Sequence, residues 1–205
     1  MDRKDFLERI RAAEKSRAGN ALPAFDDSET VSFAALGDGT AREIFERNFS
    51  RNRADVISSP EKLADFLKSK GCKKGVVDAA LGTAFGLEKH FEISRDFDRN
   101  DPDSFDFGIT RAAFAIAESG AVVLKDSSTS DRLASIAPWV HVAVVEEKSI
   151  VKTIPEGLAK MADCPYAIAI SGPSKTTDVE GVLVEGVHGP GVQACLVVCP
   201  PLRRA

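Results

Sequence analysis

The segment from residue 170 to residue 191 carries the side chains best suited to bind an anion. A loop of small, hydroxyl-bearing residues with one lysine can hold a carboxylate or phosphate through side-chain and backbone N–H donors. Lys175 supplies the charge, and Asp178 could cap a following helical turn whose N–H groups face the ligand. A tight structural turn is the alternative, and the spacing of a Walker loop is absent. The candidate ligand-binding residues are Ser171, Gly172, Ser174, Thr176, Asp178 and Glu180.

The second group with chemical potential lies in Val187-His-Gly-Pro-Gly191. His188 titrates near neutrality and could act as a general base or a hydrogen-bond donor. Gly189 lets the backbone approach a ligand closely. The alternative is a histidine that only bonds a nearby carbonyl. No CxxH or HxxxH spacing surrounds His188, so no metal site is predicted.

Glu118 is a third candidate catalytic residue, and its more specific possible role is that of the nucleophile. We predict a helix from Thr110 to Glu118 that Gly120 ends. A carboxylate at the negative end of a helix is locally unfavourable, which hints at function. Thr110 and Gly108 are candidate ligand contacts, although an N-cap at Thr110 explains these residues equally well. Arg132, beside the hydroxyl-rich residues 127–130, either gathers anions or is a solvated surface arginine.

Apolar runs that alternate with helical patterns must position these residues. Residues 1–17 predict an amphipathic helix, and Thr40 with Glu43 predicts a capping box. From residue 54 onward, strands alternate with helices, which predicts a three-layer α/β/α domain with a mostly parallel sheet. We therefore expect an N-terminal helical arm over residues 1–50 and the α/β domain over residues 51–205. The site should lie where loops 108–110, 118–120, 171–178 and 186–191 converge.

Three stretches together closely resemble the lactate-utilization C (LUD-domain) family. They are Phe107-Gly-Ile-Thr-Arg-Ala-Ala-Phe-Ala-Ile-Ala-Glu-Ser-Gly120, Ser135-Ile-Ala-Pro-Trp-Val-His-Val-Ala-Val-Val145, and Ile170 to Glu180 continued by Val187 to Gly191. The resemblance covers about residues 105–198. Lys175 stands where arginine is commoner in the family, so a bidentate anion clamp becomes a single ammonium.

The resemblance implies a fold like that of the glucosamine-6-phosphate deaminase, ribose-5-phosphate isomerase and CoA-transferase group. It also implies a role in a bacterial system that oxidises L-lactate to pyruvate, beside two partner subunits that carry iron–sulfur clusters. The Glu118-Ser-Gly120 triplet resembles the turn that supplies the nucleophile in CoA transferases. Lys175 departs from the family pattern, and the family assigns no catalytic residue that can be carried over.

Composition narrows the other possibilities. The net charge of −4 and the lack of a basic stripe argue against a nucleic-acid partner. No apolar stretch is long enough for a membrane span, and the charged first eleven residues lack a signal region, so we expect a cytoplasmic protein. Four scattered cysteines predict neither a disulfide framework nor a cluster site, and no cofactor is identified.

Three functions stay open at this point. The chain is a subunit of a lactate-oxidising complex without a cluster of its own, an enzyme acting on a CoA thioester or phosphorylated acid, or a carboxylate-binding regulator. The enzyme would use Glu118, Lys175 and His188. The sequence does not decide whether the protein is catalytic alone or whether it forms a homo-oligomer.

Overall fold

A computed structural model describes residues 2–17, 31–81, 83, 85–177 and 181–199. The chain divides into two compact units, Met1–Thr30 and Val31–Ala205. In the first unit, helix α1 (Arg3–Arg17) forms where the sequence predicts it. Among the described residues, no helix is long and apolar enough to cross a membrane.

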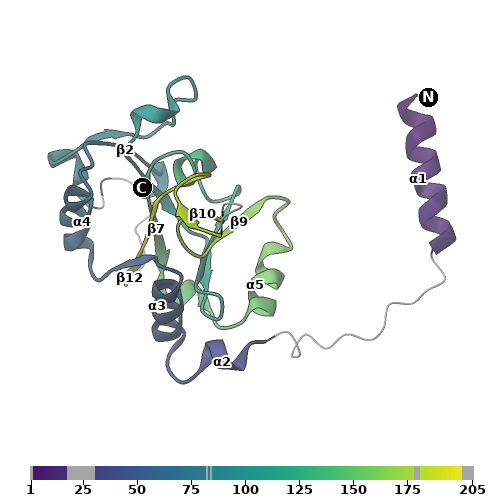
Figure 1. Cartoon of the computed structure of the whole chain (residues 1–205), viewed down its shortest axis with the longest axis horizontal. Coiled ribbons are helices and arrows are strands. Elements are labelled where there is room, and N and C mark those ends of the chain that lie inside the picture. The colour runs from purple at the N-terminus through teal and green to yellow at the C-terminus, as the bar shows by residue number, and fades with distance from the viewer. Residues whose placement is uncertain (1, 18–30, 82, 84, 178–180, 200–205) are drawn as a thin grey trace. The chain divides into compact units, whose positions relative to one another are not determined.

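A six-stranded parallel sheet forms the centre of the second unit (Figure 1). Its strand order is β1-β12-β7-β4-β2-β3, and all five neighbouring pairs are parallel. The strands are β1 (Asp55–Ile57), β2 (Lys74–Val77), β3 (Glu92–Ser94), β4 (Phe107–Arg111), β7 (Val140–Glu146) and β12 (Val192–Val198). Strands β7 and β12 are buried on both faces, which explains why their sequences are almost continuously apolar. The predicted parallel α/β class is confirmed.

A second sheet lies beside the first, with strand order β8-β5-β6-β9. Its strands are β5 (Phe114–Ile116), β6 (Ala121–Lys125), β8 (Ile150–Val151) and β9 (Ala167–Ile170), and β10 (Lys175–Thr177) pairs with β11 (Leu183–Glu185) as a separate hairpin. The predicted helix from Thr110 to Glu118 is therefore wrong. Phe114 and Ile116 pack on one side of β5, while Ala115 and Ala117 pack on the other, which is the two-residue period of a strand. Ala115 and Ala117 are fully buried on the side that faces the six-stranded sheet.

Helices cover these sheets in layers. Leu63 and Leu67 of α4 pack on one face of the six-stranded sheet. On the other face, Phe45 and Phe49 of α3 share a core with the second sheet, whose outer side packs against α5. The α-helices of this unit are α2 (Phe33–Leu36), α3 (Ala41–Arg51), α4 (Leu63–Ser69) and α5 (Ile154–Met161). The 3₁₀ turns are η2 (Pro60–Lys62), η3 (Ala79–Leu81), η4 (Leu87–Lys89), η5 (Pro102–Ser104), η6 (Arg132–Ser135) and η7 (Glu147–Ser149).

Local signals at helix ends have mixed outcomes. The capping box at α3 is confirmed, because the Glu43 N–H donates to Thr40 Oγ1 at 3.2 Å and the Thr40 N–H donates to Glu43 Oε2 at 2.8 Å. Ser59, by contrast, forms no side-chain cap, and a 3₁₀ turn beginning at Pro60 precedes α4. Helix α3 packs into the core although the sequence assigns it to the arm. The division into residues 1–50 and 51–205 stays a prediction.

Candidate functional site

The loops at 171–175 and 186–191, which carry most of the predicted site, lie against each other. The Ser174 N–H donates to the Pro190 carbonyl at 2.9 Å, and the His188 N–H donates to Ser174 Oγ at 3.2 Å. Gly189 also packs beside Ser174. However, the 186–191 loop leads directly into β12, so it lies at the amino ends of the parallel strands. Thr176 lies in β10, Ser171 is exposed, and Asp178 and Glu180 lie outside the described residues.

The Lys175 ammonium bonds within the protein. Its Nζ donates to the carbonyl oxygen of Asn52 at 2.6 Å, and Asn52 is the C-cap of α3. A cation at this helix end compensates the unpaired carbonyls of the last turn. The side-chain amide of Asn52 donates to the Ser119 carbonyl at 3.0 Å, and a Cβ on Gly172 would meet the Asn52 oxygen at 2.5 Å. Loops 118–120 and 171–175 therefore meet at the end of α3, with Lys175 in a stabilising contact.

A cavity of about 360 Å³ opens at this amino edge. Its lining includes His188, Gly189 and Trp139, and its charged lining residues are Asp103 and Asp106. The Asp106 carboxylate accepts hydrogen bonds from the backbone N–H groups of Lys73 at 2.7 Å and Lys74 at 3.0 Å. With two carboxylates and no lysine or arginine among the lining residues, this cavity disfavours an anion.

Glu118 lies in the turn between β5 and β6, where its carboxylate joins separate segments. Its side chain is buried, with the residue 4% exposed. One oxygen accepts the Ser32 N–H and the other accepts the Ile154 N–H at 2.8 Å, at the first residue of α5. No helix ends at Glu118, so its carboxylate does not face the negative end of a helix. Both oxygens bond the backbone, so the catalytic role stays a prediction that the geometry does not favour.

Exchanging Glu118 for glutamine is expected to lower the free energy of unfolding by about 2 kcal/mol. The amide keeps one acceptor but turns an N–H₂ group toward the other backbone donor, and bonds to a buried charged acceptor contribute about 1.5–3 kcal/mol each. Chemical denaturation at neutral pH measures the change. Glu92→Gln is the matched control, since that side chain is exposed. Equal stability of both variants would contradict the structural role of Glu118.

Thr110 and Gly108 lie inside β4, where both residues are buried. Thr110 Oγ1 is 2.8 Å from Nε2 of His141, and Nδ1 of His141 is 2.8 Å from Oε1 of Gln193 on β12. An amide oxygen only accepts, so Nδ1 carries the hydrogen and the Thr110 hydroxyl donates to Nε2. Burial lowers the pKa of His141 to about 4. The predicted N-cap role of Thr110 is wrong, and this buried chain of hydrogen bonds joins three strands of the sheet.

A second pocket, of about 200 Å³, opens at the opposite edge of the sheet. Arg111 ends β4 and Glu146 ends β7, and these strands are neighbours. Both residues therefore lie at the carboxyl ends of parallel strands, where open α/β sheets bind their ligands. The lining consists of Arg111, Ala112, Ala113, Lys125, Ser127, Ser128, Val144, Glu146 and Ser149.

The two cations of this pocket, Arg111 and Lys125, differ in how firmly they are held. Nη2 of Arg111 lies 3.8 Å from Oε1 of Glu146, which is an ion pair beyond hydrogen-bond distance. Oε2 of Glu146 also pairs with Nζ of Lys148 at 3.0 Å. The Lys125 ammonium donates to the Lys160 carbonyl at 2.9 Å and to the Asp163 carboxylate. Lys125 is thus committed, whereas Arg111 keeps N–H donors for a ligand.

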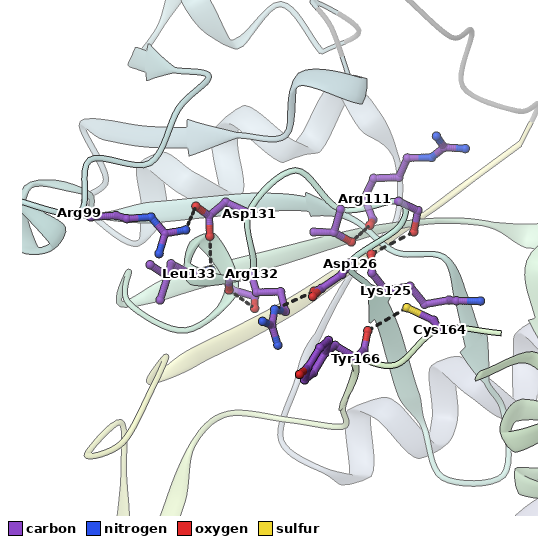
Figure 2. A network of polar contacts seen from close by, with 12 residues as sticks. Arg99, Arg111, Lys125, Asp126, Asp131, Arg132, Leu133, Cys164 and Tyr166 are labelled. Atoms are coloured by element: carbon purple, nitrogen blue, oxygen red, sulfur yellow. Dashed lines mark hydrogen bonds and ion pairs between the residues drawn. The ribbon is translucent and has the colours of Figure 1, made fainter. Parts of the chain in front are cut away.

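Two of the three serines that line the pocket, Ser127 and Ser128, lie in the loop at residues 126–131. Figure 2 shows the polar contacts at this loop, among them the pair of Arg132 with Asp126. Thr129 Oγ1 donates to the Arg111 carbonyl at 3.1 Å, which ties the loop to the end of β4. Arg132 Nε pairs with Asp126 Oδ1 at 2.7 Å, and its guanidinium lies 5.5 Å from the ring centre of Tyr166. These contacts hold the loop that carries Ser127 and Ser128 in place. The guanidinium of Arg132 is already paired with Asp126 and stacked near Tyr166.

Arg111, Glu146, His141 and Gln193 were not among the residues predicted to be functional. A signal for the first two is present in the sequence, because each is a charged residue at the end of an apolar strand run. Such positions fall at the carboxyl ends of buried parallel strands. The meeting of Arg111 with Glu146 depends on β4 lying beside β7, which no local pattern specifies.

The fold and this pocket define an α/β protein with a small, charged pocket at the carboxyl edge of a parallel sheet. The chain belongs to the LUD domain family, whose model matches residues 44–198, and this confirms the resemblance drawn from the sequence.

Curated relatives support this placement, and a solved structure shares the fold. A "Lactate utilization protein C" of Deinococcus radiodurans is 29% identical over 203 residues, covering 94% of each chain. Proteins of the same name from Bacillus subtilis and Halalkalibacterium halodurans are 38% and 36% identical over 99 and 101 residues. These matches span only 41% and 44% of the relatives' length. A crystal structure of a DUF162 family protein from Deinococcus radiodurans shares the fold, with TM-score 0.57, 24% identity, and coverage of 78% of this chain and 99% of that one.

Proposed function

We propose that this protein is a component of a bacterial L-lactate oxidation system and that it binds a small monocarboxylate in the Arg111 pocket. Lactate utilization is the function in the names of its relatives. The observation that carries the ligand class is that Arg111 lines a pocket together with three serines. Planar guanidinium groups pair with carboxylates through two parallel hydrogen bonds.

Charge and size narrow the ligand further. Arg111 and Lys125 contribute two positive charges and Glu146 one negative charge, so the lining carries a net charge of +1. That balance fits a monoanion better than a phosphate. A volume of about 200 Å³ is below the roughly 300–1,000 Å³ of sites for drug-sized ligands. A ligand of a few heavy atoms fits, which disfavours the alternative of a CoA thioester.

Binding of L-lactate is expected to weaken by at least about tenfold in Arg111→Met, because a charged, bidentate contact is lost while the side-chain volume is nearly kept. Isothermal titration calorimetry on the purified chain measures this change. Arg53→Met is the matched control, since Arg53 pairs with Glu185 and its side chain is 62% exposed. Unchanged binding in Arg111→Met, or equal loss in both variants, would contradict the assignment.

The proposed subunit role rests on family membership. In this role the chain works beside two partner proteins that carry iron–sulfur clusters. The tagged protein, purified from its native cells grown on L-lactate, tests this role. We expect two cluster-binding proteins to co-purify, and the mixture to reduce a dye with L-lactate while this chain alone does not. Recovery of the chain alone, or turnover by the pure chain, would argue against it. The cytoplasmic location stays a prediction.

A further inference from the structure

We infer that Glu146 makes the Arg111 pocket selective for 2-hydroxy acids over 2-oxo acids; this inference rests on the proposed function. Glu146 is the one carboxylate among the lining residues, and its side chain is 14% exposed. It lies beside Arg111, with 3.8 Å between Nη2 and Oε1. A ligand whose carboxylate bonds the guanidinium therefore brings the substituent on its second carbon toward Glu146.

The chemistry of a carboxylate then sets the preference. An ionised carboxylate only accepts hydrogen bonds, whereas a hydroxyl group can donate one. A 2-hydroxyl can bond Glu146, while a 2-oxo oxygen meets another acceptor across a short gap. Serine hydroxyls cannot impose the same choice, because each both donates and accepts. The discrimination is thus assigned to Glu146 rather than to Ser127, Ser128 or Ser149.

The environment keeps Glu146 in place for this role. The ammonium group of Lys148 lies 3.0 Å from Oε2 of Glu146. The Lys148 side chain is 67% exposed, so this ion pair reaches Glu146 from the solvent side. The neighbouring carboxylate of Glu147 is directed elsewhere, because it accepts from Arg42 at 2.9 Å and from the Cys199 thiol at 2.7 Å. Two adjacent glutamates therefore differ in whether they line the pocket, which provides a matched pair of variants.

Three acids of similar size separate the contribution of the carboxylate from that of the substituent on the second carbon. L-lactate carries a 2-hydroxyl, pyruvate a 2-oxo group, and propionate neither. For the unmodified protein we expect L-lactate to bind more tightly than pyruvate by on the order of tenfold or more, the effect of one hydrogen bond to a charged acceptor. Propionate should lie between them. Calorimetric titration of each acid measures the three dissociation constants.

Glu146→Gln is expected to bring the lactate-to-pyruvate ratio close to one, because the amide can donate to an oxo oxygen as well as accept from a hydroxyl. Glu147→Gln should leave the ratio unchanged. Propionate binding by Glu146→Gln shows that the pocket is intact. Equal binding of L-lactate and pyruvate by the unmodified protein would overturn the inference without any variant. A preference that persists in Glu146→Gln would also overturn it. If none of the three acids binds, the proposed function itself fails.

Discussion

Replacing Gly108 by alanine is expected to destabilise the protein by roughly 3 kcal/mol or more, the range of severe overpacking. Gly108 lies in β4, and a Cβ there would stand 1.8 Å from the carbonyl oxygen of Ala134 in η6. That oxygen belongs to the backbone, so it cannot rotate away. Without this contact, alanine would be the better strand residue by about 0.5–1 kcal/mol, so the sign of the change is itself informative.

Chemical denaturation of Gly108→Ala, measured beside Gly189→Ala, tests this expectation. A Cβ on Gly189 meets Ser174 at 3.4 Å, an ordinary van der Waals distance, so the control should stay near the stability of the unmodified protein. Gly108 and Gly189 are both predicted ligand contacts, but packing requires a glycine only at position 108. A stable Gly108→Ala variant would mean that η6 does not pack on β4 as described.

Acidification from pH 6.5 toward pH 4 is expected to remove about 3 kcal/mol of stability through His141 alone. Burial lowers the pKa of His141 from 6.5 to about 4 in the folded protein. Between these values the unfolded chain binds the proton and the folded chain does not, so stability rises with pH. The contribution is fully present above pH 6.5 and is lost as the pH falls through this window.

Denaturation at several pH values between 7 and 4.5 measures this slope. The chain has three histidines, and the other two, His90 and His188, are exposed. The double variant His90→Gln, His188→Gln should therefore keep the pH dependence, whereas His141→Gln should lose it above about pH 5, where few carboxylates titrate. A slope that survives in His141→Gln would show that another group is responsible.

Local sequence signals predicted much of the fold. Thr40 and Glu43 cap a helix through contacts only three residues apart, and the apolar runs at 140–145 and 194–198 are buried parallel strands. The prediction failed between Thr110 and Glu118, where alanine-rich sequence favours a helix locally. Both sides of β5 are buried, one toward the six-stranded sheet and the other against α5, and this burial imposes a strand. Tertiary packing decides such segments.

The candidate site was predicted less well, for a topological reason. Ser174 and His188 do lie together, but the loop that contains His188 enters β12 rather than leaving a strand. It therefore lies at the opposite edge from the pocket of Arg111 and Glu146. Those two residues meet only because β4 and β7 are neighbours, although 35 residues separate them in sequence. Lys175 bonds the end of α3, and its role in binding an anion stays a prediction.

The most direct test of ligand binding in the Arg111 pocket is a crystal structure of the protein in complex with L-lactate. We expect the ligand carboxylate within hydrogen-bond distance of the Arg111 guanidinium, with the 2-hydroxyl toward Glu146 and with Ser127 and Ser128 beside the ligand. Lactate bound instead at the amino edge, beside Lys175 and His188, would contradict this account and support the site predicted from the sequence.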